Sequence, residues 1–268
     1  MTKAHGAGAA RRTLIMGILN VTPDSFSDGG RFAAVDAAIA QARRMAAEGA
    51  DILDIGGEST RPGYEPVDTA TELARVLPVI EAVAPDLGVP LSIDTRKADV
   101  AAAVVAAGAR MVNDVWGLQR DERLARVAAE AGVDVVAMHN RDEIDAAIDI
   151  VDDMRRFFDR TIAIARAAGI GDDRLVLDPG IGFGKTLAQN LVAVRRLPEI
   201  RALGFRVLLG VSRKSSIGRI LDRPVGERLI GTVAMNVWAM RDNVDIIRVH
   251  DVAEHVDAMK IVDALREA

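Results

Sequence analysis

The sequence predicts an α/β protein folded as a single (β/α)8 (TIM) barrel. Short runs of apolar and β-branched residues alternate with longer stretches of helical periodicity, and this alternation occurs eight times along the 268 residues. Most of the short runs are continuously apolar, as in parallel strands that are covered on both faces. Eight units of about 33 residues also match the usual size of such a barrel. We expect residues 13–268 to form this one domain and residues 1–12 to be a disordered extension.

The eight expected strands are residues 13–21, 52–56, 91–94, 111–115, 133–138, 175–178, 207–211 and 246–249. Between them, apolar residues recur at helical spacing, as in Val35, Ile39 and Ala42. Glycines stand where helices should stop, at positions 49, 108, 132 and 169. A doubly wound open sheet is the competing architecture, but the chain holds no Pro-, Gly- or Ser-rich linker that favours it.

The composition excludes several classes of protein. Half of the residues are apolar and the net charge is −5, which argues against a disordered protein and against a nucleic-acid binder with a basic stripe. No apolar run reaches the length of about 18 residues that a bilayer requires, and residues 1–12 lack the apolar core of a signal peptide. Cysteine is absent, which removes disulfides and thiolate chemistry. We expect a cytoplasmic protein without nucleic-acid or membrane partners.

Polar residues gather at the carboxyl ends of the expected strands, where the active sites of (β/α)8 barrels are built. In chain order they are Asn20, Glu58, Thr60, Arg61, Asp94, Asn113, His139, Asp178, Arg213, Lys214, Arg248 and His250. Asp94, Asn113 and Asp178 supply acceptors that suit a flat heterocycle with several N–H donors, such as an aminopyrimidinone. Taken singly, the two aspartates could instead be helix N-caps or turn formers.

Three of these strand-end residues are cations, namely Arg61, Lys214 and Arg248. In a chain of net negative charge, their convergence predicts an anionic ligand, and phosphate or diphosphate fits best. The alternative is that they are surface charges or partners of the strand-end aspartates. The four histidines form no zinc-binding motif, but Asn20 could offer an amide oxygen to a Mg²⁺ that arrives on substrate phosphates.

Glycine-bearing segments raise two further points. The GFGKT string at residues 182–186 is not a P-loop, because the motif would need glycine where Pro179 stands, and we expect a tight backbone floor after the sixth strand instead. Residues 20–30 and 56–66 are long loops on the catalytic face, each with one aromatic residue, Phe26 or Tyr64. They fit lids that close over a second substrate, and the alternative is an ordinary solvated connection.

Seven strings on successive strands resemble dihydropteroate synthase, and they are NVTPDSFSDGG, DIGGESTRPG, SIDTRK, NDVWG, LDPGIGFGKT, GVSRKSSIG and IRVHDV. The resemblance covers residues 14–265. It implies a cytoplasmic, homodimeric, Mg²⁺-dependent transferase of folate biosynthesis with a (β/α)8 barrel, and a target of sulfonamides. Such an enzyme condenses 6-hydroxymethyl-7,8-dihydropterin diphosphate with p-aminobenzoate, giving 7,8-dihydropteroate and diphosphate. The implied route is dissociative, because the electron-rich pterin can stabilise a cation after diphosphate has left.

The resemblance also assigns roles to residues of this sequence. It implies a pterin site formed by Asp94, Asn113, Met138, Asp178, Phe183 and Lys214. It implies that diphosphate is bound by Asn20, Thr60, Arg61, Arg248 and His250, with Asn20 as the protein ligand of Mg²⁺. The p-aminobenzoate pocket would comprise Phe26, Pro62, Lys214 and Ser215. The residues expected to act in catalysis are Asp94, Asp178, Lys214 and Arg248.

One segment departs from the family pattern. After the fifth strand the chain has MHNRDEID at residues 138–145, where many members carry a longer loop, and this leaves the role of that loop open. Two rival functions remain at this stage. A pterin-dependent methyltransferase barrel would share the acceptor floor, and a silent paralogue would bind pterin without turnover.

Overall fold

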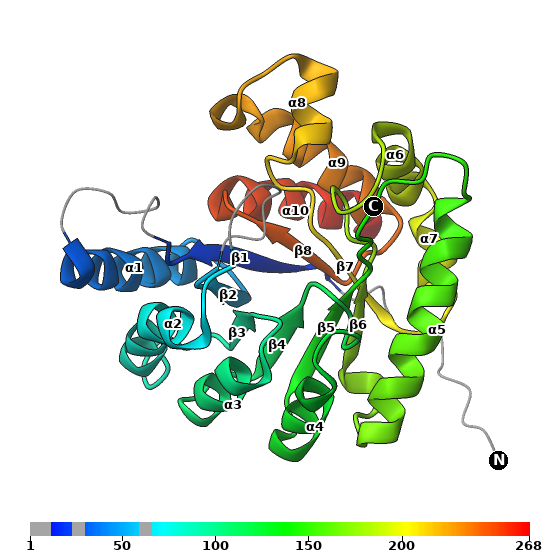
Figure 1. Ribbon diagram of the computed structural model, residues 1–268. Helices are drawn as coiled ribbons and strands as arrows, with labels where there is room; N and C mark the ends of the chain where they lie inside the picture. Colours follow the sequence, from blue (N-terminus) through cyan, green and yellow to red (C-terminus); the bar gives the residue numbers. More distant parts are fainter. Residues whose placement is uncertain (1–11, 23–29, 59–65) are drawn as a thin grey trace.

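The computed structural model describes residues 12–22, 30–58 and 66–268, and these residues form a closed ring of eight parallel strands (Figure 1). The strands follow chain order around the barrel, and the eighth pairs with the first. This confirms the predicted (β/α)8 barrel and excludes the open sheet. The strands are β1 (Leu14–Asn20), β2 (Ile52–Gly56), β3 (Leu91–Asp94), β4 (Met111–Asp114), β5 (Asp134–Met138), β6 (Leu175–Asp178), β7 (Arg206–Leu209) and β8 (Ile246–Val249).

Helices surround the ring of strands, and neighbouring helices pack against each other (Figure 1). The helices are α1 (Gly30–Ala47), α2 (Thr69–Val83), α3 (Ala98–Ala106), α4 (Glu122–Ala131), α5 (Ile150–Ala168), α6 (Leu187–Arg195), α7 (Leu197–Arg201), α8 (Ser215–Leu221), α9 (Leu229–Arg241) and α10 (Val252–Glu267). Gly132 and Gly169 end α4 and α5 in the left-handed conformation, as predicted for helix stops. Residues 1–11 of the predicted extension lie outside the described residues.

The seventh strand differs most from its predicted range. It ends at Leu209, whereas the sequence predicted a strand over residues 207–211. The ladder with β8 stops at the pair of Leu209 and Ile247, and residues 210–214 form a loop that leads into α8. Within this loop, Arg213 has a positive φ of 56°, which no strand can accommodate. Residues 210 and 211, which were predicted to end the strand, therefore belong to an irregular loop beside the barrel mouth.

Apolar residues fill two separate regions of the core. The larger region lies between the barrel and the helices, with side chains such as Ile15, Ile55, Val79 and Phe158 fully buried. The smaller region fills the inside of the barrel and consists of Met16, Ile52, Met111, Val136, Val176, Leu208 and Ile246. Because this inner layer is apolar and packed, the barrel is closed below any site at its mouth.

Candidate active site at the barrel mouth

The seven apolar residues that fill the inside of the barrel form a plug, and a polar layer lies directly above it. Side chains two positions apart on a strand face the same side, so the residue that follows each plug residue by two also faces inward. Applied to the seven plug residues, this rule gives Ile18, Asp54, Asn113, Met138, Asp178, Gly210 and Arg248. The strand register also sets Asn20, Gly56, Asp94 and Asn113 abreast at the carboxyl ends of β1 to β4. Two residues further along the strands, the barrel interior thus changes from apolar to largely polar.

Arg248 lies at the centre of an ion-pair network in this layer. Its Nε is 2.6 Å from Oδ2 of Asp54, and its Nη2 is 2.7 Å from Oδ2 of Asp94. Asn113 donates from Nδ2 to the same Asp54 oxygen at 2.9 Å. Burial disfavours the charged form of Arg248, but the two carboxylates hold its pKa above the usual value. Asp54 therefore fixes both a cation and an amide of the predicted site.

The Asp94 carboxyl is buried and has an unusual ionisation. Burial raises its pKa to about 7, against the opposing effect of Arg248 and with a contribution from neighbouring Asp54. Its Oδ1 is buried and has no hydrogen-bond partner among the described residues. This oxygen is an acceptor that a ligand N–H can satisfy.

Asp178 and Lys214 converge with Arg248 over the backbone of Gly210. A Cβ built on Gly210 would lie 3.8 Å from Oδ2 of Asp178, 3.9 Å from Nζ of Lys214 and 3.9 Å from Cβ of Arg248. Burial raises the pKa of Asp178, which accepts a hydrogen bond from the Gly180 N–H at 2.7 Å. Burial lowers the pKa of Lys214 to about 8. Position 210 is therefore bordered by the Asp178 carboxylate, the Lys214 ammonium and the base of the Arg248 side chain.

The loop after β6 forms the backbone floor that the glycine spacing predicted. Lys214 donates to the carbonyl of Ile181, and its Nζ lies 4.7 Å from the ring centroid of Phe183. A Cβ on Gly180, whose φ is 64°, would overlap the carbonyl oxygen of His139 and lie 3.2 Å from Cγ of Met138. The predicted pterin residues Met138 and Phe183 therefore flank a surface made largely of main chain.

Asn20 and His250 stand at the rim of this layer. Oδ1 of Asn20 and Oδ2 of Asp94 both lie 3.8 Å from a Cβ built on Gly56, so both oxygens border the same position on β2. Nδ1 of His250 is 2.9 Å from Oγ of Ser212. Within residues 12–22, 30–58 and 66–268, no three His, Asp or Glu side chains are grouped as a metal site would need.

A family model described as pterin binding enzyme matches residues 16–250. The dihydropteroate synthase of Clostridium beijerinckii is 50% identical over 255 residues, which cover 95% of this chain and 94% of the relative. That of Bacillus subtilis is 47% identical, over 98% of this chain and 92% of the relative. The chain belongs to the dihydropteroate synthase family. Its activity is accordingly the transferase reaction of that family, the condensation of a dihydropterin diphosphate with p-aminobenzoate.

Solved dihydropteroate synthases have the same fold as this chain. The crystal structure of the Clostridium difficile enzyme in the presence of pteroic acid matches with a TM-score of 0.93 and 50% identity, over 96% of this chain and 97% of that one. The Xanthomonas albilineans enzyme with 4-aminobenzoic acid matches with a TM-score of 0.92 and 46% identity, over 96% and 94% of the two chains.

The structure brings together most of the site residues that the sequence predicted for this dihydropteroate synthase family member. Asp94, Asn113, Asp178, Lys214 and Arg248 share the polar layer. Ser215 is the first residue of α8, directly after Lys214. The remaining predicted residues lie outside the described residues, and they are Phe26, Thr60, Arg61 and Pro62, together with Tyr64 of the predicted lid.

Two buried charges were missed at the sequence level. Asp54 is fully buried within β2, where it was counted as part of an apolar strand. A single carboxylate in a five-residue buried strand was the signal that could have revealed it. Lys185, in the GFGKT string, donates to the carbonyls of Gly180 at 2.8 Å and Phe183 at 3.0 Å. Burial lowers the pKa of Lys185 to about 7, and no signal in the string indicates its contacts.

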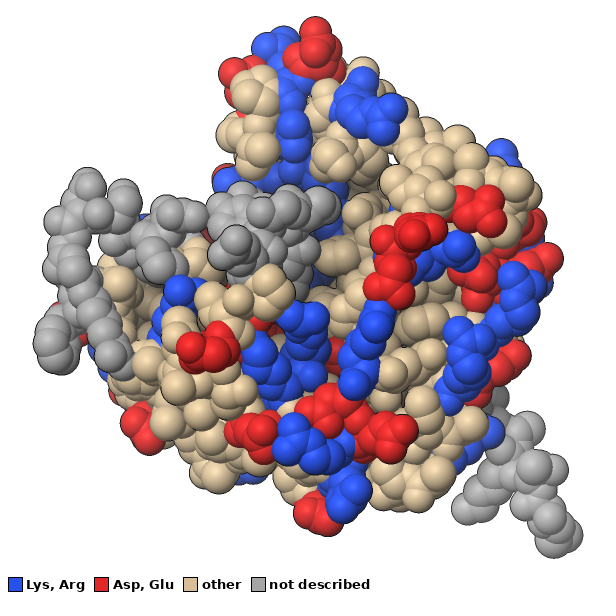
Figure 2. Space-filling view, in the orientation of Figure 1, with Lys and Arg blue, Asp and Glu red and all other residues tan. Residues whose placement is uncertain are grey.

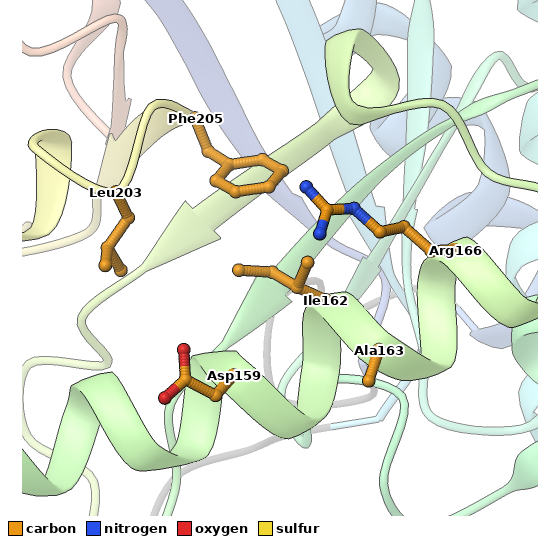
Figure 3. Close-up of a pocket in the computed structure, with 6 residues that line it drawn as sticks. All are labelled: Asp159, Ile162, Ala163, Arg166, Leu203 and Phe205. Carbon is orange, nitrogen blue, oxygen red and sulfur yellow. The ribbon is translucent and has the colours of Figure 1, made fainter.

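A surface pocket lies away from this site (Figure 3). Asp159, Ile162, Ala163 and Arg166 of α5 form one side, and Leu203 and Phe205 form the other. Phe205 immediately precedes β7, so the pocket is near the amino end of that strand, opposite to the end where Lys214 follows. It contains none of the predicted site residues.

The outer surface carries charges of both signs. On the face in Figure 2, Lys and Arg side chains are interleaved with Asp and Glu side chains. Exposed charges of the described residues also form ion pairs, such as Arg120 with Asp142. Arg123, for example, bonds both Asp99 and Asp121. The described part of the chain contains no helix that combines the length and the apolar character needed to cross a membrane.

Proposed function

We propose that this chain performs its condensation by a dissociative route in the polar layer of the barrel mouth. The observation that carries the proposal is the meeting of Asp178, Lys214 and Arg248 over Gly210, beside the acceptors Asp94 and Asn113. Acceptors of this kind suit the N–H donors of a pterin ring, and the Lys214 ammonium suits a ring acceptor. Met138 and Phe183 pack beside the ring on this proposal.

The proposed chemistry begins with loss of diphosphate. The bond between the exocyclic methylene carbon and the diphosphate oxygen breaks, and its electron pair leaves with the oxygen. The carboxylates of Asp94 and Asp178 face the positive charge that then spreads over the pterin, which stabilises the cation electrostatically. The amine of p-aminobenzoate attacks the methylene carbon and releases a proton. No enzymatic nucleophile is required.

Diphosphate needs cations and hydrogen-bond donors at the rim. We assign this role to Arg248 and His250, with Thr60 and Arg61 contributing on the strength of the sequence resemblance. Arg248 binds two carboxylates through a planar guanidinium, a geometry that serves phosphate oxygens equally well. The p-aminobenzoate pocket is assigned to Phe26, Pro62, Lys214 and Ser215 by the same resemblance.

We propose Mg²⁺ as the metal of the reaction, with Asn20 as its protein ligand. The amide oxygen of Asn20 is a hard donor that borders Gly56, as does the Asp94 carboxylate, and Mg²⁺ commonly uses one or two protein ligands while phosphates and waters complete its shell. When bound there, the ion would neutralise charge on the departing diphosphate.

The decisive experiment measures diphosphate release with and without p-aminobenzoate. The proposal predicts that sustained release over many turnovers depends on the amine, which captures the cation, and yields dihydropteroate. A methyltransferase domain would release no diphosphate, and a silent paralogue would bind pterin, detected by calorimetry, without releasing diphosphate under either condition. Omission of Mg²⁺ with excess chelator tests the metal, because release should then fall while binding of a pterin without phosphate persists.

We propose further that the chain acts as a homodimer in the cytoplasm. In support of a dimer, the neighbouring helices α9 and α10 expose the large apolar side chains of Ile230, Trp238, Ile261 and Leu265, with Ile230 77% exposed. Exposed apolar side chains of this size favour a protein interface when they form one patch. Cell fractionation tests the location.

A further inference from the structure

The backbone of Arg213 is held in an unfavourable conformation immediately before Lys214. Its φ of 56° is in the left-handed region, where a residue with a side chain persists only if its surroundings fix it. The Arg213 N–H donates to Oγ1 of Thr232 at 3.0 Å, and its carbonyl accepts from Nη1 of Arg228 at 3.0 Å. Oγ1 of Thr232 donates to the Arg228 carbonyl at 2.9 Å, so the two residues that bind the Arg213 backbone are also bonded to each other. The loop after β7 is thereby tied to the start of α9.

The side chain of Arg213 makes a second connection, to the loop after β8. Its Nε is 3.0 Å from Oδ2 of Asp251, and its Nη2 donates to Oδ1 of the same carboxylate. One residue earlier on each loop, Oγ of Ser212 accepts from the His250 N–H at 3.1 Å. The two loops are therefore joined at two successive positions.

Each loop carries residues assigned to a different part of the reaction. Lys214 and Ser215 follow Arg213, and they serve the pterin and p-aminobenzoate in the proposed function. His250 precedes Asp251 and serves diphosphate. An ion pair between Arg213 and Asp251 thus fixes the distance between the groups that hold the amine and those that hold the leaving group.

We propose that Arg213 is a positioning residue, which acts through Lys214 and Ser215 rather than on substrate. The bidentate ion pair with Asp251 and the left-handed backbone of Arg213 together hold the side chains of Lys214 and Ser215 in place relative to the loop after β8. The inference rests on the proposed function of Lys214, Ser215 and His250. It corrects the expectation that Arg213 belongs to the polar residues of the mouth, because the guanidinium binds Asp251 instead.

The test compares Arg213→Gly, Arg213→Lys and Asp251→Asn with the parent enzyme. Glycine adopts the left-handed backbone at little cost and removes the ion pair with Asp251. Lysine keeps the positive charge but cannot bind the carboxylate through two nitrogens. We expect a higher KM for p-aminobenzoate and a loss in its kcat/KM of up to about 10²-fold, as for a misplacement near 1 Å. The dissociation constant for pterin, measured by calorimetry, should rise less than the KM for p-aminobenzoate, because Lys214 is one of several pterin contacts whereas the p-aminobenzoate pocket depends on both Lys214 and Ser215. Combining Arg213→Lys with Asp251→Asn should cost no more than the worse single change.

Arg223→Ala is the matched control. Arg223 is an exposed arginine of the same segment that pairs with Glu227, and among the described residues its side chain forms no hydrogen bond or ion pair with either loop. We expect its variant to match the parent in both KM values and in kcat. If the Arg213 variants lower Tm and kcat while both KM values stay at the parental level, Arg213 is merely structural and the inference is wrong. Normal kinetics, or a loss of pterin affinity equal to the loss for p-aminobenzoate, would also overturn it.

Lys214→Met separates this inference from the function on which it rests. A parent enzyme with amine-dependent diphosphate release and an impaired Lys214→Met variant establishes the role of Lys214. Normal Arg213 variants would then refute the positioning role alone. If Lys214→Met itself turned over normally, the assignment of Lys214 would fail first.

Discussion

Arg248 and Asp94 form an ion pair inside the barrel, with Nη2 of the arginine 2.7 Å from Oδ2 of the aspartate. Asp54 of β2 binds the same guanidinium. The Arg248 side chain therefore links its own strand, β8, to β2, and these two strands are the neighbours of β1 in the barrel. Ion pairs within the protein thus fix the positions of Arg248, Asp94 and Asp54, and the loss of each pair should have a measurable effect on stability or turnover.

Removing Asp54 should destabilise the fold as well as the site. Asp54→Ala leaves a buried guanidinium with one carboxylate fewer and frees the Asn113 amide, and breaking a buried pair in this way costs about 3–5 kcal/mol. Urea unfolding measures this cost. Asp99→Ala is the control, since Asp99 forms an exposed pair with Arg123 and its loss should change the unfolding free energy by about 0.5 kcal/mol or less. Equal effects of the two variants would contradict the structural role of Asp54.

Neutralising the charges that face the pterin and diphosphate should slow turnover. Asp94→Asn, Asp178→Asn and Arg248→Ala each remove one preorganised electrostatic group, which is worth about 10² to 10³ in rate. Steady-state kcat measured by diphosphate release checks the expectation. Near-normal kcat in any one variant would remove that residue from the mechanism.

The pH dependence of kcat/KM should be bell-shaped. Burial raises the pKa of Asp94 to about 7, so its carboxylate is lost as pH falls below that value. Burial lowers the pKa of Lys214 to about 8, so its positive charge is lost as pH rises above that value. Activity should therefore decline on both sides of a maximum between about 7 and 8. Lys214→Arg should remove the alkaline limb, because arginine stays protonated, and an unchanged alkaline limb in this variant would assign that limb to another group.

A charge on the apolar face of α9 should separate the proposed dimer. Trp238 is 46% exposed there, and Trp238→Asp would bury an unpaired carboxylate in an interface. Sedimentation velocity should then report monomers where the parent gives dimers. Ile144→Asp is the control, because Ile144 is 61% exposed on the segment between β5 and α5 and its replacement should leave the assembly intact. A monomeric parent would refute the dimer outright.

The barrel was predictable because its physics is local and repetitive. Short apolar strands and stretches of helical periodicity alternate eight times, and glycines such as Gly132 and Gly169 mark the ends of helices. Asp94, Asn113 and Asp178 were also predictable, since barrel geometry sends the carboxyl ends of all strands to one mouth. The position of a polar residue on a strand therefore carried most of the information about the site.

Two of the missed features depend on loop conformations that the pattern of residues does not reveal. Lys185 binds carbonyls through a loop whose conformation follows from the glycines around it. Arg213 was expected at the mouth, but its partner Asp251 is 38 residues away and is reached only through the left-handed turn. Asp54 is different, because two-residue spacing from Ile52 would have placed it inside the barrel.

Gly180 limits how the backbone floor after β6 can evolve. Any other residue there would drive its Cβ into the carbonyl oxygen of His139, which belongs to the main chain and cannot rotate away. A substitution at position 180 therefore requires the main chain to shift. An inhibitor that contacts the main chain at Gly180 would accordingly be hard to evade by a mutation at that position.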